Sequence, residues 1–258
     1  MFRNIALELK KVAVPVLITL GGLTILTCVL SCTLYLNYTM FYDIDAWEIG
    51  TEYLGLLFPL FVTVPICWEL YYERRDHFLV YTLPRMNKWR YLGTKWCACA
   101  LAAFAILFVP YILSAVFALY VKAPAEILVP DDYFFSPYGH VFNYLYTEMP
   151  LLYALLLSLW KAFLGVLTMT FGFVLALYGK NIFVILTGPF IYVILENFIW
   201  SVLGLPTYRF VTAFEPSSLP PDAIHLSSFI VGPVFMCGII VIIALYYAKL
   251  KKRAVYPV

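Results

Sequence analysis

Long apolar runs dominate the chain, and short polar segments separate them. A helix needs about 20 predominantly apolar residues to cross a bilayer, and six runs reach that length. We expect transmembrane helices over residues 12–36, 53–72, 96–121, 149–178, 182–205 and 226–248. The pattern therefore predicts an all-α polytopic membrane protein in which residues 1–258 form a single transmembrane domain.

The composition excludes most functions that need a water-facing domain. Hydrophobic residues make up 64% of the 258 residues and charged residues 12%, whereas a soluble domain carries roughly 25% charge. The chain contains no phosphate-binding P-loop, no His-Glu-x-x-His pair and no Gly-x-Ser-x-Gly elbow. We therefore expect a chain that is not an enzyme, with no catalytic residues, no cofactor, no metal site and no nucleic-acid partner.

The basic residues indicate the orientation in the membrane. Of the 17 Lys and Arg residues, only Lys122, Lys161 and Arg209 fall outside the predicted cytoplasmic loops and ends. The loops on the opposite side are acidic instead, with Asp43, Asp45, Glu48, Glu126, Asp131, Asp132, Glu215 and Asp222. Because cytoplasmic loops carry an excess of Lys and Arg, we expect a multi-pass protein of the cell membrane with both termini in the cytoplasm.

The first residues carry an amphipathic pattern. Phe2, Ile5, Ala6 and Leu9 fall on one helical stripe, and the basic residues at positions 3, 10 and 11 fall opposite. This pattern favours a short helix that lies in the membrane interface before the first span. A frayed charged leader is the alternative.

The most informative polar segment is the cytoplasmic loop from residue 73 to residue 95. Asp76 can cap a short helix over residues 77–83, which Pro84 ends, and Asn87 can cap the helix that follows. The short helix is rich in bulky residues. It can either lie flat on the membrane or insert into a groove of a cytoplasmic partner.

This loop also carries a family resemblance. Tyr72-Glu73-Arg74-Arg75-Asp76, then Tyr81-Thr82-Leu83-Pro84, then Asn87-Lys88-Trp89-Arg90-Tyr91-Leu92 and Lys95 resemble the corresponding loop of type-2 ABC exporter permeases. The layout agrees as well: an interfacial N-terminal helix, six spans and a Pro-rich outer hairpin, here over residues 204–225. The family usually has a glycine after the acidic cluster, where this chain has His77 and Phe78, so the resemblance does not identify the substrate.

The resemblance implies the membrane subunit of an ATP-driven exporter of an amphipathic or peptide-like substrate. A separate cytoplasmic ABC ATPase would bind ATP and Mg, and a second permease subunit, identical or a sister chain, would complete the transporter. The loop helix would then be the coupling helix. Its contact residues would be Glu73, Asp76, Phe78, Tyr81, Leu83 and Arg85.

Two charges lie deep in the predicted spans. Lys161 lies about 18 Å and Glu196 about 13 Å from the outer ends of their helices, at 1.5 Å per residue. A charge at the bilayer centre costs roughly 2.5–3.5 kcal/mol on insertion scales, so such residues are normally paired or functional. Three interpretations stay open: a Lys161–Glu196 ion pair, a contact with substrate or a second subunit, and a lysine exposed to water.

Aromatic residues make up 19% of the chain and gather at span ends and in the outer loops. Anchoring at the membrane interface is the first explanation. A vestibule for an amphipathic peptide or lipid-like cargo is the second.

Two other functions compete with the exporter. A self-sufficient secondary transporter or channel needs no ATPase, but secondary transporters commonly show internal repeats and several ionisable groups at depth. An intramembrane enzyme or an assembly factor is the third hypothesis. Co-purification with an ATPase separates the exporter from both.

Overall fold

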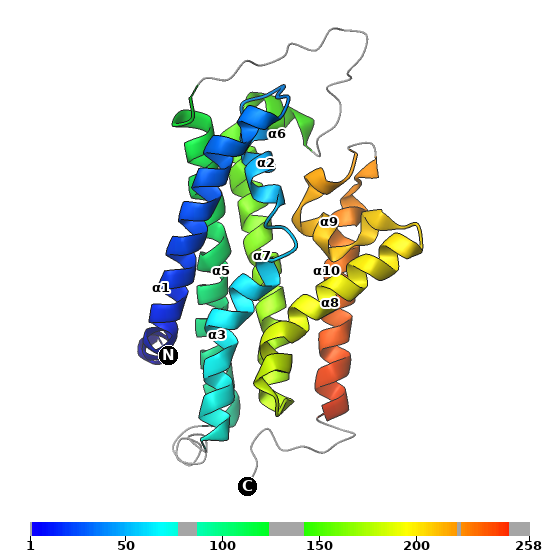
Figure 1. Ribbon diagram of the computed structural model, residues 1–258. Helices are drawn as coiled ribbons and strands as arrows, with labels where there is room; N and C mark the ends of the chain where they lie inside the picture. Colours follow the sequence, from blue (N-terminus) through cyan, green and yellow to red (C-terminus); the bar gives the residue numbers. More distant parts are fainter. Residues whose placement is uncertain (1, 77–86, 124–141, 221–222, 248–258) are drawn as a thin grey trace.

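The computed structural model describes residues 2–76, 87–123, 142–220 and 223–247, and these residues form helices and turns without a β-strand (Figure 1). The α-helices are α1 (Phe2–Thr33), α2 (Asp45–Glu52), α3 (Phe58–Arg75), α5 (Lys88–Tyr120), α6 (Asn143–Glu148), α7 (Pro150–Tyr178), α8 (Ile182–Val202), α9 (Phe210–Phe214) and α10 (Leu226–Leu245). Within the same described residues lie the short 3₁₀ helices η1 (Leu34–Asn37), η3 (Pro206–Tyr208) and η4 (Pro216–Ser218).

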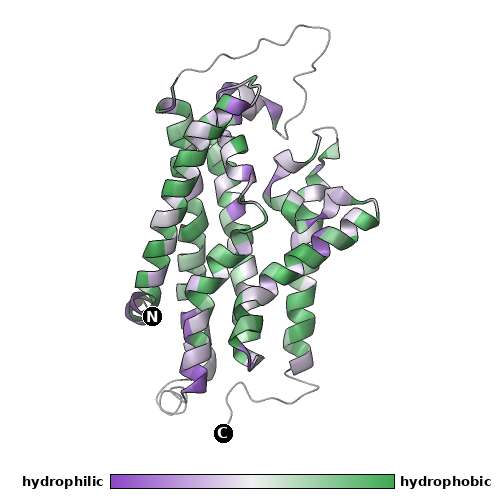
Figure 2. Cartoon of the chain, viewed as in Figure 1, coloured by the Kyte–Doolittle hydropathy of each residue, from purple (hydrophilic) through white to green (hydrophobic). Residues whose placement is uncertain are grey.

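Five of the described helices are long and apolar enough to cross a membrane: α1, α5, α7, α8 and α10. This finding confirms an all-α, membrane-embedded protein. Helix α3 is not among the five, because four of its 18 residues are charged. Figure 2 shows the contrast, with hydrophobic colours along most of the long helices and hydrophilic colours at the lower end of α3.

The long helices pack side by side as a bundle (Figure 1). Helix α5 packs against both α1 and α7, and α3 packs against α7 and α8. Helix α1 begins and α10 ends at the same end of the bundle. The first turns of α1 are continuous with the rest of it, so the short N-terminal helix that we expected is not a separate element.

The predicted span over residues 53–72 has a different start in the structure. Helix α2 precedes it, residues 53–57 form a turn, and α3 begins only at Phe58. Pro59 lies in the first turn of α3, where a missing N–H costs nothing. Asp45 holds the start of α2, because one carboxylate oxygen accepts the N–H groups of Phe41 at 2.7 Å and Tyr42 at 2.9 Å.

The Pro-rich segment over residues 204–225 is not a simple outer loop. It folds back onto the bundle as η3, α9 and η4, and Phe210 and Phe214 of α9 are fully buried. The ring of Phe214 stacks on Phe58 at a centroid distance of 3.8 Å. Gly232 of α10 permits the approach, since a Cβ there would lie 2.8 Å from the Cα of Phe210.

This packing overturns two expectations about charge. We placed Glu48 and Glu215 in acidic outer loops, but Glu48 is 8% exposed and Glu215 is 1% exposed. Helix α2 carries the first into the bundle, and the segment between α9 and η4 carries the second. Both carboxylates therefore lie within the packed interior.

Candidate functional site

Buried charges gather in two places, and we name each set by its position. The loop-side cluster comprises Glu8, Lys11, Glu69, Glu73, Tyr91 and Lys95. The core cluster comprises Glu48, Tyr153, Lys161 and Glu215.

The loop-side cluster is centred on a buried lysine. Lys95 of α5 is 1% exposed, and its Nζ lies 3.4 Å from Glu8 of α1 and 3.6 Å from Glu69 of α3. Lys95 also forms an ion pair and a hydrogen bond with Glu73. Tyr91 adds a hydrogen bond, donating its hydroxyl to Glu73 at 2.8 Å. One lysine thus joins the ends of three helices.

A second lysine completes the network. Lys11 of α1 lies 2.7 Å from Glu73 and 3.0 Å from Glu8, and it is the more exposed of the two lysines. A buried ion pair needs several well-placed partners to offset its desolvation. The two lysines share their carboxylate partners, and this network holds α1, α3 and α5 in one relative position.

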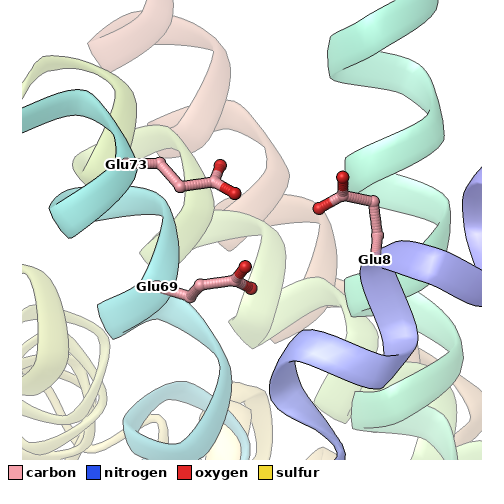
Figure 3. A group of neighbouring side chains, drawn as sticks. All are labelled: Glu8, Glu69 and Glu73. Carbon is pink, nitrogen blue, oxygen red and sulfur yellow. The ribbon is translucent and has the colours of Figure 1, made fainter. Parts of the chain in front are cut away.

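The three carboxylates also meet the geometric requirement of a metal site. Figure 3 shows Glu69 and Glu73 of α3 and Glu8 of α1 pointing toward one another, and one oxygen from each lies within 4.8 Å of the others. The ammonium group of Lys95 contacts all three, so a positive charge already lies where a metal ion would bind. We therefore interpret the group as an ion-pair network and assign it no metal.

The loop-side cluster lies where the predicted coupling loop leaves and re-enters the bundle. Helix α3 ends at Arg75, and α5 begins at Lys88 after Asn87. Asn87 caps α5 as predicted, since its side-chain oxygen accepts the N–H of Trp89 at 3.0 Å. Arg74 donates a hydrogen bond to the carbonyl of Gly179, which ties the end of α3 to the turn between α7 and α8.

The predicted coupling residues divide between described and undescribed parts. Glu73 points into the loop-side cluster, and Asp76 lies at the end of α3, mostly exposed and 3.6 Å from Arg75. The remaining four residues, Phe78, Tyr81, Leu83 and Arg85, lie outside the described residues, as does the helix expected over 77–83.

The core cluster contains a fully buried ion pair. Lys161 of α7 lies 2.6 Å from Glu215, and their side chains are 0% and 2% exposed. Three rings surround the ammonium group, with centroids 4.5 Å (Tyr111), 5.2 Å (Trp47) and 5.3 Å (Phe214) from Nζ. Rings within about 6 Å attract a cation through their π faces, which adds to the attraction of the carboxylate.

Glu48 extends the core cluster toward α2. Its carboxylate accepts a hydrogen bond from the hydroxyl of Tyr153 of α7, at 3.0 Å. Nearby, Tyr146 of α6 donates a hydrogen bond to Asp45 at the start of α2. The core cluster and its neighbours therefore connect α2, α6, α7 and the segment after α9.

Of the three interpretations of Lys161, the ion pair with Glu196 is wrong, because Lys161 pairs with Glu215 instead. Glu196 of α8 has its own role: its two oxygens lie 3.1 and 3.0 Å from the backbone N–H of Phe210, which begins α9. One glutamate thus holds the start of α9 and another holds its end. Glu215 directly follows the apolar stretch 210–214, which is the sequence signal for its burial. We interpreted that stretch as part of an outer loop.

No known protein family matches the chain, and neither the curated proteins nor the solved structures contain a match. The two clusters therefore have to be interpreted from their own geometry and chemistry.

Proposed function

We propose that this chain is the membrane-spanning permease subunit of an ATP-driven exporter, with ATP hydrolysis on a separate cytoplasmic ATPase. The observation that carries the proposal is the loop-side cluster. It fixes the two helix ends between which residues 77–86 run, and the sequence that resembles a coupling loop spans both of these ends and residues 81–84.

The mechanical argument concerns how force reaches the bundle. A loop that receives movement from an ATPase transmits it only if the helices at its two ends move with it. Glu73 near the end of α3 and Lys95 near the start of α5 are bonded to each other, and Lys11 and Glu8 add α1. A push on the loop would then displace three helices as one unit.

The topology follows the basic residues. In the proposal, α2 and α3 together form a broken second crossing, which gives six crossings with the five long helices. The ends of α3 and α5 that flank the basic loop face the cytoplasm, as do both termini. The chain then works in the cell membrane together with a second permease subunit.

The partner contact lies in the loop helix. Interface energy concentrates in a few buried aromatic and arginine anchors, each worth about 2 kcal/mol or more. Phe78, Tyr81, Leu83 and Arg85 are the anchors in the proposal, and Asp76 precedes them at the exposed end of α3. The exported cargo would be amphipathic or peptide-like.

The experiment is purification of the tagged full chain from its native membrane, followed by identification of co-purifying ATPases. Phe78→Ser and Leu83→Ser should each reduce the recovered ATPase by about 30-fold, since 2 kcal/mol corresponds to a factor of that order. The matched control is Leu7→Ser, which changes an exposed apolar residue in the first two turns of α1. If both loop variants retain the ATPase at the control level, the assignment fails.

A secondary transporter is the second candidate, and the core cluster favours it. Glu48, Lys161, Glu215 and Glu196 are four ionisable side chains buried in the bundle, where the sequence alone indicated two. Such groups mark ion or proton pathways in many transporters. Purified chain that moves cargo in liposomes without ATPase, driven by a proton gradient, would establish this function instead.

A further inference from the structure

An apolar groove of about 320 Å³ lies between α6, α7 and α10. Its lining residues are Phe142, Leu145, Tyr153, Leu156, Leu157, Trp160, Leu226, Phe229 and Ile230. The α7 residues follow a spacing of three and four, as do those of α10, so each helix presents one continuous stripe to the groove. The two stripes face each other across the groove.

The groove has a buried floor and an exposed rim. Tyr153 and Leu157 of α7 are 6% and 7% exposed, whereas Leu226 and Ile230 of α10 are 67% and 48% exposed. Both helices belong to the five that are apolar enough to cross a membrane. Where α7 and α10 cross a membrane, the exposed rim would face the lipid around the bundle.

The lining offers nothing for a polar ligand. Tyr153 uses its hydroxyl on Glu48 at 3.0 Å, and Trp160 donates its indole N–H to the carbonyl of Ala213 at 3.0 Å. Both residues therefore present only ring surface to the groove. An engineered apolar cavity of about 150 Å³ stays dry and takes up benzene or xenon, so an apolar lining of this kind suits hydrocarbon better than a polar ligand.

We propose that this groove binds an acyl chain of a membrane phospholipid. The bilayer supplies that chain at the rim, and the groove runs along α7 from Tyr153 to Trp160, about 10 Å at 1.5 Å per residue. Helices α7 and α10 run in the same direction (Figure 1), and the groove residues lie in the first turns of each helix. Their N-terminal partial positive charges would lie near the lipid phosphate.

The bound chain would also touch the supports of the core cluster. Tyr153 holds Glu48, and Trp160 holds Ala213 of α9, next to the segment that carries Glu215. An acyl chain packed on both rings would keep them in place. Phospholipid therefore stabilises the folded-back segment, whatever the chain transports.

The test places a photoreactive side chain in the groove by the change Ile230→benzoylphenylalanine. The full chain is purified from membranes in detergent, washed and irradiated, and the adducts are identified by mass spectrometry. The control is Ile242→benzoylphenylalanine on the same helix, which is 64% exposed and outside the groove. A retained lipid should give at least about tenfold more phospholipid adduct at 230 than at 242, equivalent to a preference of 1.4 kcal/mol.

A variant that fills the groove provides a second test. Leu157→Trp should abolish the adduct at 230, while Leu159→Trp, on α7 but outside the lining, should leave it unchanged. If Leu157→Trp does not fold, the comparison of phospholipid adducts at positions 230 and 242 still tests the proposal. Equal phospholipid adducts at both positions would overturn the proposal. So would adducts at 230 only with detergent, with residues 124–141 or with a second copy of the chain.

Discussion

Removing the charge from Lys161 tests the core cluster most sharply. The change Lys161→Met keeps an apolar chain of similar length but leaves Glu215 buried with one weak partner, the hydroxyl of Ser217 at 3.3 Å. The reverse change Glu215→Leu leaves the ammonium group among three rings without the carboxylate that it bonds to. Each single change strands a charge in the interior.

The magnitude follows from the burial of the pair. Breaking a buried ion pair by removing one partner costs about 3–5 kcal/mol, whereas replacing both by apolar residues is often neutral or stabilising. We therefore expect each single variant to lose about 3 kcal/mol or more of unfolding free energy. The double variant Lys161→Met with Glu215→Leu should be no less stable than either single variant, which gives a coupling energy of at least about 3 kcal/mol in magnitude.

The assay is reversible unfolding in mixed detergent micelles, with the four proteins of the double-mutant cycle measured side by side. Glu196→Gln serves as the control, because its remaining carbonyl oxygen can still accept the N–H of Phe210. Lys161→Met and Glu196→Gln should therefore be additive within about 0.5 kcal/mol. The reasoning is refuted if Lys161 couples to position 196 and not to position 215.

Three further changes test other parts of the structure by the same unfolding assay. Gly232→Ala should lower the free energy of unfolding by about 1–3 kcal/mol, because the added Cβ meets the backbone of α9. Gly238→Ala on the same helix has open space around it and should be neutral or slightly stabilising. Equal effects of the two changes would contradict the packing of the folded-back segment. Asn87→Ala removes the cap of α5 and should lower the free energy of unfolding by about 1 kcal/mol. An unchanged free energy of unfolding would rule out the cap. Lys95→Met should lose about 3–5 kcal/mol, and a loss below about 1 kcal/mol would show that the loop-side cluster is not a stabilising network.

Much of the fold was accessible from the sequence. Unbroken apolar runs predict α5, α7, α8 and α10 to within a few residues at most ends, because a bilayer permits few structures other than a complete helix. Asn87 was predicted to cap α5 and does so. Local chemistry decides these features, so the local sequence reveals them.

The buried charges were not accessible in the same way. Glu48 and Glu215 stand in short polar segments, which are normally loops, and only tertiary packing shows that both segments enter the bundle. The partner of Lys161 depended on which carboxylate that packing brings near, and helix depth alone favoured Glu196. A stretch such as 210–214, apolar but far too short to span, was the one signal of a folded-back segment.

The loop-side cluster shows an intermediate case. Glu69 and Glu73 are four residues apart, so the sequence places them on one face of α3. Their bonds with Lys95 and with Glu8 of α1 depend on how three helices pack. The sequence therefore indicated Glu69 and Glu73 but not that Lys95 and Glu8 are their neighbours.

The central claim is that a separate ATPase drives this chain through residues 77–86. The most direct measurement is the ATP hydrolysis rate of the co-purified ATPase in liposomes, with the unaltered chain and with Phe78→Ser or Leu83→Ser at equal abundance. The account predicts that the unaltered chain stimulates hydrolysis and that both variants abolish the stimulation while the bundle stays folded. Full stimulation by both variants, or no effect of the chain on hydrolysis at all, would contradict it.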